Sequence, residues 1–592
     1  MFKQIISRIS DDIIDLDLKQ AGKWFFYSIL VGIISGLGAI LFHVACQGGL
    51  FVFLGLICGY YPSEPGGEPA IFHAINNEFI RWFLIFVPAI GGLLSGILIY
   101  TYAPEAQGHG TDAAIDAYHN KRGYIKPIIP LIKTVASALT IGSGGSGGRE
   151  GPIAQIGAGF GSFLATKLKL SEKNRRILLV AGLGAGVGSI FRAPLAGSLF
   201  AVEVLYRDLE FEYEAIFPVT ISSIVAYSIF AMQFGWHSLF ITPDFEFSNP
   251  AELLPYTVLA VVVAFFAITY VKIFYGFTHY FAKLRIKNHF KPAIGGLMVG
   301  AIGFFVPETL AFSYGIIQDA LDGNVALTLL LVVGLGKILT TSFTIGSGGS
   351  GGVFGPSMVI GGCLGGLVGI LFNKIGLVAQ PGAFVIVGMA GFFAGAANTP
   401  ISTLFMVSEM TGNYHLIVPS MWVCTISYLL CGKWSIYEKQ VQNRISSPVH
   451  RGDFAVDILK QIRVKDVMKD QKIVTIKNNT RFQEILDIIT HSQFHYFPVE
   501  DEFGKVKGVI SFHDIQENMF DKELNDYIVA DDLTRENIIY ALPEDNLNST
   551  LEKFIKNEMD SLPVVDSLSN MKLKGMISRK EIFASYYEKL ME

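Results

Sequence analysis

Long apolar runs occupy most of the first three quarters of the chain. A transmembrane helix needs about 20 apolar residues to cross the hydrocarbon core of a bilayer. Four runs are long enough: Trp24–Cys46, Phe83–Tyr102, Leu253–Phe274 and Val325–Ser342. Other runs are short or cut by glycine and proline: Gly151–Leu168, Pro194–Leu205, Pro356–Phe372, Pro381–Ala397 and Pro400–Met410. Broken helices at membrane depth are typical of transporters, so the pattern predicts a polytopic membrane protein with many interrupted helices.

An internal repeat divides this membrane region into two halves. The segment IGSGGSGG occurs twice, at Ile141–Gly148 and at Ile345–Gly352, and two residues later each copy continues with Gly-Pro. The same offset of about 204 residues relates Pro194-Leu195 to Pro400-Ile401 further along the chain. Two related halves of about 200 residues are therefore predicted, and inverted repeats are common in such folds.

The glycine-rich loops are candidates for binding an anion. Each loop is followed by a proline, which is tolerated in the first turn of a helix. A helix N-terminus carries unpaired N–H groups and a partial positive charge, so two such ends could hold a small anion. The GxGxxG pattern within the glycines is a weak dinucleotide signal, because no βαβ unit or ribose-binding acid accompanies it. Close helix packing by glycine is the remaining alternative.

Glu150 lies on the first loop, at the expected start of a helix. A carboxylate inside a membrane segment is costly and suggests a function. A deprotonated Glu150 side chain would itself occupy the anion position, and protonation would release it, which makes Glu150 a candidate gate and proton acceptor. The alternative is a salt bridge between Glu150 and the neighbouring Arg149 at a loop surface.

Charge separates this apolar region from a soluble tail. The last 129 residues, from Val464, contain 16 basic and 24 acidic residues, about 31% of the segment, against about 12% in the preceding 463. The acidic tail and the net charge of −5 argue against a nucleic-acid partner. The five cysteines lie in apolar runs without CxxC pairs, and no metal-ligand cluster or catalytic nucleophile motif is evident. We therefore expect neither a metal site nor an enzyme.

These motifs resemble those of the CLC family of chloride channels and chloride/proton exchangers, across about Trp24–Tyr437. Gly148–Pro152 reads GREGP, Gly352–Pro356 is similar to the family's GxFxP motif, and Ser435-Ile436-Tyr437 matches its pore tyrosine segment. The resemblance implies two inverted halves of broken, tilted helices and a homodimer with one anion pathway per subunit. It also implies that Glu150 is the gate, that Tyr437 donates its hydroxyl to the anion, and that the N–H groups of Val353 and Phe354 face the same ion. The resemblance assigns the pore loops to Gly108, Gly110, Gly148, Arg149, Gly151, Pro152, Gly352, Gly355 and Pro356.

Two positions depart from the family pattern. The first pore motif, GSGIP, corresponds here to Gly108–Asp112, so His109 takes the place of an anion-binding serine. A neutral imidazole donates one N–H and a protonated one also adds charge, so His109 is a pore candidate and selectivity for chloride is open. A histidine in a surface loop, outside the pore, is the alternative. The internal proton-transfer glutamate of family exchangers corresponds to Val204, which cannot pass a proton. Glu203, one residue earlier, is expected to bond helix ends or the dimer region.

The soluble tail resembles a pair of cystathionine-β-synthase (CBS) motifs. Short β-branched strand runs flank amphipathic helices in two similar units. In that family a Ser/Thr-x-x-Asp segment can bind the ribose of an adenine nucleotide (ATP, ADP or AMP). Ser511 and Asp514 fit this pattern, whereas the second unit has Ser578 followed by Glu581. The alternative is a purely structural dimerisation module.

The expected fold is an α-helical polytopic membrane protein with a CLC-type inverted repeat, plus a cytoplasmic α/β CBS-pair domain. The predicted segments are a cytoplasmic amphipathic segment (1–23), a membrane domain (24–437, with repeats at about 24–235 and 250–437), a linker (438–463) and the CBS pair (464–587). We expect a multi-pass plasma-membrane protein with both termini in the cytoplasm.

The expected function is passive, channel-like movement of chloride or a similar small anion, because valine occupies position 204. Chloride/proton antiport is the alternative. A CBS-based membrane sensor without transport is a further alternative, in which the glycine loops would serve only for packing.

Overall fold

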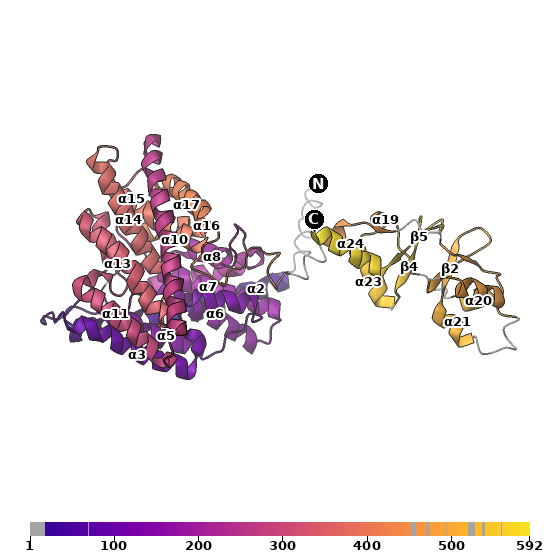
Figure 1. Cartoon of the computed structure of the whole chain (residues 1–592), viewed down its shortest axis with the longest axis horizontal. Coiled ribbons are helices and arrows are strands. Elements are labelled where there is room, and N and C mark those ends of the chain that lie inside the picture. Colours follow the sequence, from indigo (N-terminus) through magenta and orange to yellow (C-terminus); the bar gives the residue numbers. More distant parts are fainter. Residues whose placement is uncertain are drawn as a thin grey trace, which may run out of the picture. The chain divides into compact units, whose positions relative to one another are not determined.

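The computed structural model describes residues 18–68, 70–450, 458–468, 473–492, 494–518, 527–534, 539–557 and 559–591. Most of the predicted N-terminal segment (1–23) lies outside the described residues, and the first described helix begins at Leu18. The chain forms two compact units, Met1–Pro448 and Val449–Glu592 (Figure 1).

Among the residues that the structure describes, the first unit contains helices and no strand. Its first half contains α2 (Leu18–Leu50), α3 (Phe83–Tyr102), α4 (Thr111–His119), α5 (Ile129–Gly142), α6 (Glu150–Lys167), α7 (Glu172–Ile190), α8 (Pro194–Glu203) and α9 (Ile216–Phe234). Its second half contains α10 (Leu253–Lys283), α11 (Lys291–Phe305), α12 (Tyr314–Leu321), α13 (Leu327–Gly346), α14 (Phe354–Lys374), α15 (Pro381–Ala397), α16 (Pro400–Thr411) and α17 (Ile417–Cys431). The prediction of many interrupted helices is confirmed.

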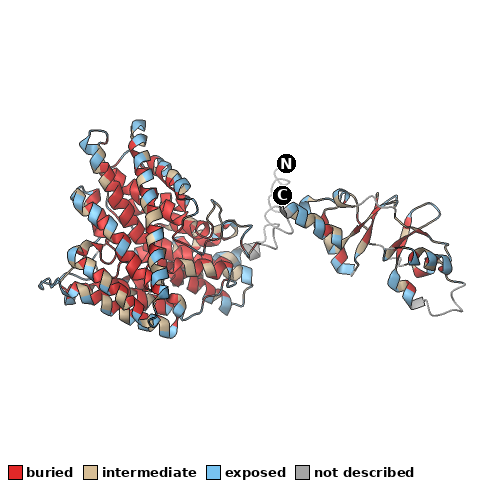
Figure 2. Ribbon diagram, viewed as in Figure 1, coloured by how far each residue is buried: buried red, intermediate tan, exposed pale blue. Residues whose placement is uncertain are grey.

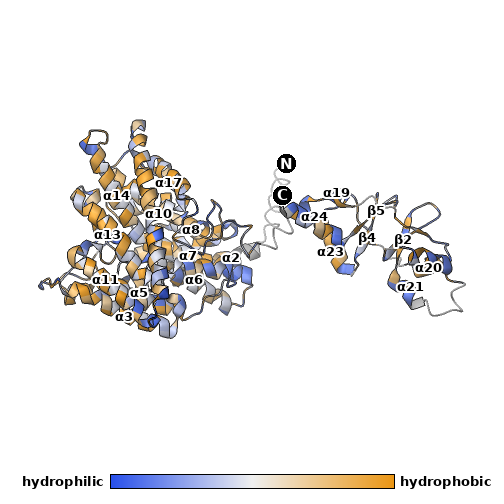
Figure 3. Cartoon of the chain, viewed as in Figure 1, coloured by the Kyte–Doolittle hydropathy of each residue, from blue (hydrophilic) through white to orange (hydrophobic). Residues whose placement is uncertain are grey.

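Among the described residues, six helical segments are long and apolar enough to cross a membrane: Gly22–Ile57, Phe83–Tyr102, Tyr213–Phe234, Pro250–Lys283, Leu327–Gly346 and Phe354–Lys374. The sequence pattern did not predict the span at Tyr213–Phe234, and it placed the run from Pro356 among those that are short or interrupted. That helix in fact spans 21 residues, because Gly-Pro lies in its first turn rather than before it. Buried residues fill the interior of the unit (Figure 2). Apolar side chains such as Phe86, Leu297 and Leu331 are also exposed, where lipid would cover them. Figure 3 shows that hydrophobic residues predominate along the helices of this unit.

The two repeats meet around a local two-fold axis. Gly148 and Gly352, equivalent residues of the two copies, exchange N–H···O bonds of 2.7 and 2.6 Å. Gly144 and Gly348, also equivalent, share a positive φ of 103° and 99°, which glycine adopts without strain. This reciprocal pairing explains why the same glycine-rich sequence recurs in each half.

Two glutamates cap each other's neighbouring helices in the same reciprocal way. Glu203, at the end of α8, accepts the N–H groups of Ile401 (3.0 Å) and Ser402 (2.7 Å) at the start of α16. Glu409, on α16, accepts the N–H of Ala196 at 2.8 Å, at the start of α8. The expectation that Glu203 bonds a helix end is confirmed, and each carboxylate satisfies N–H groups that the helix leaves unpaired.

The first part of the predicted linker, 438–448, belongs to the membrane unit. Val441 pairs with Tyr206 in a parallel bridge. The side-chain amide of Gln440 donates to the carbonyl oxygens of Val204 (3.1 Å) and Ala397 (2.9 Å). This segment therefore extends the membrane unit beyond Tyr437, because it forms hydrogen bonds with residues of that unit.

The five cysteines are all buried and free.

The second unit contains two small sheets with helices. Strand β2 (Tyr496–Glu500) pairs in parallel with β1 (Ile476–Lys477) and antiparallel with β3 (Val506–Ser511), and β4 (Ser561–Val565) pairs antiparallel with β5 (Leu573–Ser578). The helices are α19 (Val464–Val467), α20 (Phe482–Thr490), α21 (Phe512–Asn518), α22 (Ala530–Leu533), α23 (Leu547–Asn557) and α24 (Arg579–Met591). Phe482 and Phe497 lie in one hydrophobic core and Phe554 in a second. The expected α/β architecture of two similar units is confirmed.

Candidate anion pathway

The two glycine-rich loops bring the N-termini of α6 and α14 together. Helix α6 begins at Glu150 and α14 at Phe354, directly after the paired glycines. A side chain could not replace these glycines, because a Cβ at Gly148 would lie 2.0 Å from Glu150 Oε2 and one at Gly352 would lie 2.8 Å from the Gly151 nitrogen. The loop glycines thus permit a close approach of two helix ends, each with unpaired N–H groups.

The Glu150 carboxylate lies at the N-terminus of the opposite helix. Its Oε2 accepts the backbone N–H of Gly355 at 3.2 Å, within the first turn of α14. Its Oε1 accepts a hydrogen bond from the hydroxyl of Tyr314. Both groups are buried. The carboxylate therefore occupies the position at which a helix N-terminus would otherwise attract a free anion.

Arg149 is paired with Glu68 rather than with Glu150. Its Nη1 and Nη2 lie 2.5 and 2.8 Å from the two Glu68 oxygens, and Nη1 also donates to His43 Nδ1 at 2.9 Å. The guanidinium lies 5.8 Å from the ring centre of Tyr314. The alternative of a salt bridge between Glu150 and Arg149 at a surface is wrong, since Glu68 neutralises the arginine and leaves Glu150 available.

Two buried lysines hold the loops beneath these helix ends. Lys133 donates to the carbonyl oxygens of Ala106 (2.9 Å) and Gly108 (2.7 Å). Lys337 donates to the carbonyl oxygen of Ala311 (2.6 Å) and to Ser313 Oγ (2.7 Å). The two lysines are 204 residues apart, the offset of the repeat. That offset was the signal that could have identified them from the sequence.

His109 and Tyr437 lie side by side at the other end of the loops. Their ring centres are 5.5 Å apart, and Tyr437 is buried. The rings of Phe200 and Phe393 connect Tyr437 to Phe354 at the start of α14. The structure thus brings His109, Tyr437 and Phe354 into one region, with Val353 buried directly before α14.

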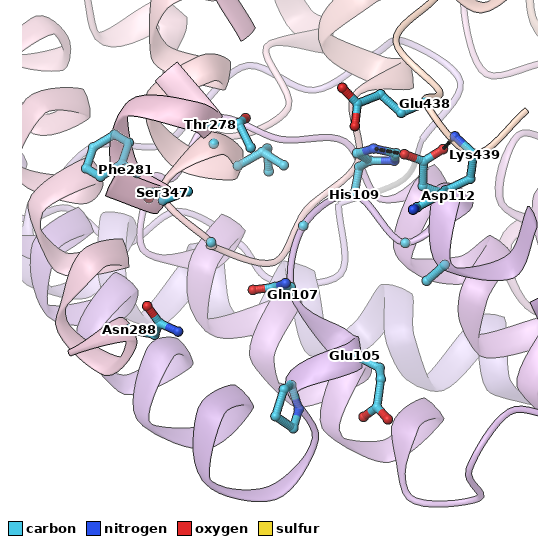
Figure 4. Close-up of a pocket in the computed structure, with 18 of the residues that line it drawn as sticks. Glu105, Gln107, His109, Asp112, Thr278, Phe281, Asn288, Ser347, Glu438 and Lys439 are labelled. Atoms are coloured by element: carbon cyan, nitrogen blue, oxygen red, sulfur yellow. Dashed lines mark hydrogen bonds and ion pairs between the residues drawn. The ribbon is translucent and has the colours of Figure 1, made fainter. Parts of the chain in front are cut away.

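A vestibule of about 820 Å³ opens beside His109 (Figure 4). Its lining includes Gly108, Gly110, Asp112 and the segment Glu438–Lys439. His109 Nε2 lies 3.4 Å from Asp112 Oδ2, and Asp112 Oδ1 accepts the backbone N–H of Lys439 at 3.1 Å. The two residues that differ from GSGIP, His109 and Asp112, therefore form a histidine–carboxylate pair in the lining of the vestibule.

Sequence reasoning missed Tyr314 and Glu68. Tyr314 lies in the segment of the second repeat that corresponds to the His109 loop. The backbone N–H of Gly351 donates to the carbonyl oxygen of Gly108, beside His109. In the other repeat, the N–H of the equivalent Gly147 donates to the carbonyl oxygen of Ala311, close to Tyr314. No motif marks either residue, and only the folded chain places them beside Glu150 and Arg149. Val204 is buried at the end of α8, where its carbonyl oxygen accepts from Gln440.

In the second unit, Ser511 and Asp514 bond each other. Ser511 Oγ donates to Asp514 Oδ2 at 2.6 Å, and the same carboxylate oxygen accepts the Ser511 N–H at 2.8 Å. Ser578 and Glu581 repeat this arrangement. Ser511, Ser578 and Glu581 line one cleft of about 1120 Å³ between the two sheets' ends. The motif thus caps a helix and also borders a cavity.

The helical architecture and the paired loops define a membrane transport protein with two related halves. Residues 91–432 match the family described as "Voltage gated chloride channel", and 464–521 and 529–588 each match the CBS domain. The chain belongs to the voltage-gated chloride channel (CLC) family, whose activity is anion transport, and it carries a pair of CBS domains. The multi-pass membrane class and the expected CLC-type fold are confirmed.

Among similar proteins, the "H(+)/Cl(−) exchange transporter ClcA" of Vibrio vulnificus is 28% identical over 71% of this chain and 90% of its own length. The "Putative chloride channel protein ClcB-like" of Ralstonia nicotianae is 28% identical over 60% of this chain and 85% of its own. A solved "slow cyanobacterial Cl−/H+ antiporter" shares the fold with a TM-score of 0.61, at 23% identity over 70% of this chain and 96% of that one. A "eukaryotic CLC transporter" has a TM-score of 0.59, at 18% identity over 95% of this chain and 99% of that one.

Tyr314→Phe tests whether the tyrosine hydroxyl holds the Glu150 carboxylate at α14. A hydrogen bond to a charged group contributes about 1.5–3 kcal/mol, and its loss makes the carboxylate easier to protonate and displace. We expect faster chloride flux at neutral pH and a half-maximal flux at a pH about one unit higher or more. The measurement is chloride flux from proteoliposomes between pH 4.5 and 8.

Tyr256→Phe is the matched control, because it removes a hydroxyl from another buried tyrosine, one that stacks on Phe384. Its flux should follow the wild-type curve. A Tyr314→Phe protein with the wild-type pH curve would show that the hydroxyl does not hold the carboxylate.

Proposed function

We propose that this protein exchanges chloride, or a similar small anion, for protons across a membrane, with Glu150 as the gate and proton acceptor. The observation that carries the proposal is the Glu150 carboxylate at the N-terminus of α14, bonded by the Gly355 N–H and the Tyr314 hydroxyl. A carboxylate in that position competes with a transported anion for the same helix end. The two occupants therefore alternate.

Proton binding couples to this competition. Protonation removes the negative charge of Glu150, weakens its hold on the helix N-terminus and allows an anion to take its place. When the anion leaves, the carboxylate returns and its proton is released. The names of the Vibrio exchange transporter and of the solved antiporters support proton coupling in this chain as well.

The inner part of the proposed pathway runs from the His109 vestibule to Glu150. The anion would accept hydrogen bonds from the Tyr437 hydroxyl and from the N–H groups of Val353 and Phe354, which begin α14. The glycines of the pore loops around Gly108–Gly110, Gly148–Pro152 and Gly352–Pro356 would allow the backbone to approach the anion closely. Chloride is the first substrate to test, and His109 makes the selectivity among chloride, nitrate and fluoride a separate question.

Passive channel-like conduction is the second candidate, and Val204 favours it. A valine at the position of the internal proton-transfer glutamate offers no proton acceptor between the inner solution and Glu150. In that case Glu150 would open and close the path without net exchange. The sensor hypothesis is weaker, because the family to which the chain belongs transports anions.

We further propose the assembly and location that the family resemblance implies. The protein forms a homodimer with one anion pathway per subunit, spans the plasma membrane and exposes both termini to the cytoplasm. The CBS pair, with its charged surface, would then lie in the cytoplasm.

Glu150→Gln tests the gate. Glutamine keeps the size of the side chain but cannot ionise, so the pH dependence of flux should weaken and proton movement should cease. The measurement is chloride flux with the intraliposomal pH recorded at the same time. The control is Glu105→Gln, which removes another carboxylate, one that lines the vestibule. An unchanged pH dependence in Glu150→Gln would contradict the gate.

The CBS pair is the proposed site for an adenine nucleotide, in the cleft bordered by Ser511 and Glu581. A ribose would compete with the Ser511–Asp514 bond, so nucleotide binding would reorganise the start of α21. We expect calorimetric titration of the full-length protein to detect ATP, ADP or AMP, and Asp514→Ala to weaken binding about tenfold, as loss of a hydrogen bond to a charged group does. Absence of heat for all three nucleotides would leave the pair a structural module.

A further inference from the structure

His109 differs from other buried histidines of the described chain in having a ring nitrogen with no partner. It is 93% buried, its relative exposure being 7%, and its Nδ1 has no hydrogen-bond partner. The ring lines the inner vestibule and lies beside Tyr437. An unpaired buried polar atom costs about 1–3 kcal/mol, so a partner that reached this nitrogen from the vestibule would remove that cost.

The neighbouring carboxylate determines where the ring carries its hydrogen. Asp112 Oδ2 lies 3.4 Å from Nε2, and Asp112 is held in place by the Lys439 backbone. A carboxylate only accepts hydrogen bonds. The favoured neutral tautomer therefore carries hydrogen on Nε2 and leaves a lone pair on Nδ1.

An anion cannot bind to that lone pair. It needs an N–H at Nδ1, and with Nε2 already protonated this requires the doubly protonated, positively charged ring. The imidazolium would then lie between two negative partners, Asp112 on one side and the anion on the other. Each partner lowers the cost of charging a buried ring.

His43 provides the contrast. It is equally buried and its Nε2 also lies close to a carboxylate, 3.3 Å from Glu68. Its Nδ1, however, accepts a hydrogen bond from Arg149, which only donates. Both ring nitrogens of neutral His43 therefore have a hydrogen-bond partner, and neither is left to bind an anion.

Other charged groups face the vestibule, but among the described residues only Asp112 forms an ion pair with His109. The remaining titratable groups of the lining and of the loop support are Tyr100, Glu105, Asp116, Lys121, Lys126, Lys133, Tyr275, Lys291, Tyr437, Glu438 and Lys439. Because acids and bases are mixed in this set, it creates no large local field of one sign that would replace the effect of Asp112.

We infer that His109 is a second proton-binding site of the pathway, which takes up a proton when a small anion binds at its inner end. This inference rests on the proposed function, which places the anion beside His109 and Tyr437. It supplies a proton acceptor on the inner side, where Val204 offers none. By linkage, protonation of His109 strengthens anion binding by the same factor by which the anion favours protonation.

Calorimetry in the Glu150→Gln background isolates this site, because the gate carboxylate no longer binds protons. The full-length variant in detergent is titrated with chloride at pH 7 in phosphate and in Tris, whose ionisation enthalpies differ. The difference in observed heat gives the number of protons taken up per chloride. We expect net uptake of up to one proton per chloride.

Three further variants are compared in the same background. His109→Gln should abolish the uptake and weaken chloride binding about tenfold, as for one hydrogen bond to a charged group. Asp112→Asn should reduce the uptake. His119→Gln should retain it, since both His119 ring nitrogens are hydrogen-bonded, to Ser447 and Leu205.

Chloride heat without proton uptake in the Glu150→Gln protein would overturn the role of His109 and leave anion binding intact. Uptake that persists in His109→Gln would overturn it as well. Absence of chloride binding in every variant would instead contradict the proposed function, and with it this inference.

Discussion

The fold depends on bringing two helix N-termini together in the interior of a membrane protein. The reciprocal hydrogen bonds between Gly148 and Gly352 hold the N-termini of α6 and α14 close together. No larger residue fits at either glycine position. Unpaired N–H groups in a low-dielectric interior demand a partner. The Glu150 carboxylate supplies it, which is why a membrane-buried acid is tolerated there.

The charged residues around the Glu150 carboxylate are paired with other groups, so they do not bind Glu150 or an anion themselves. Glu68 neutralises Arg149, so the arginine does not capture Glu150 or a passing anion permanently. Lys133 and Lys337 bond loop carbonyl oxygens instead of carboxylates. The proposed anion-binding position is therefore built mainly from backbone dipoles and hydroxyl groups, which would bind weakly enough to release an ion.

Much of this arrangement could be predicted from the sequence, because the same glycine-rich segment occurs unchanged in both halves. The duplicated glycine segments predicted the paired loops, the Gly-Pro steps predicted helix starts near Glu150 and Phe354, and the charge distribution separated the tail. Tyr314 and Glu68 could not be predicted, since their partners are 164 and 81 residues away and no motif marks them. The length of α14 was underestimated because a proline in a first turn does not end a helix. The His109–Asp112 pair needed the fold of the loop to become visible.

The most direct test of proton-coupled anion exchange is a single measurement on proteoliposomes: chloride efflux under an outward chloride gradient, with internal pH recorded at the same time. The account predicts that chloride movement drives protons inward against their own gradient, and that a proton gradient drives chloride in return. Chloride efflux without any proton movement would contradict exchange and establish a Glu150-gated channel.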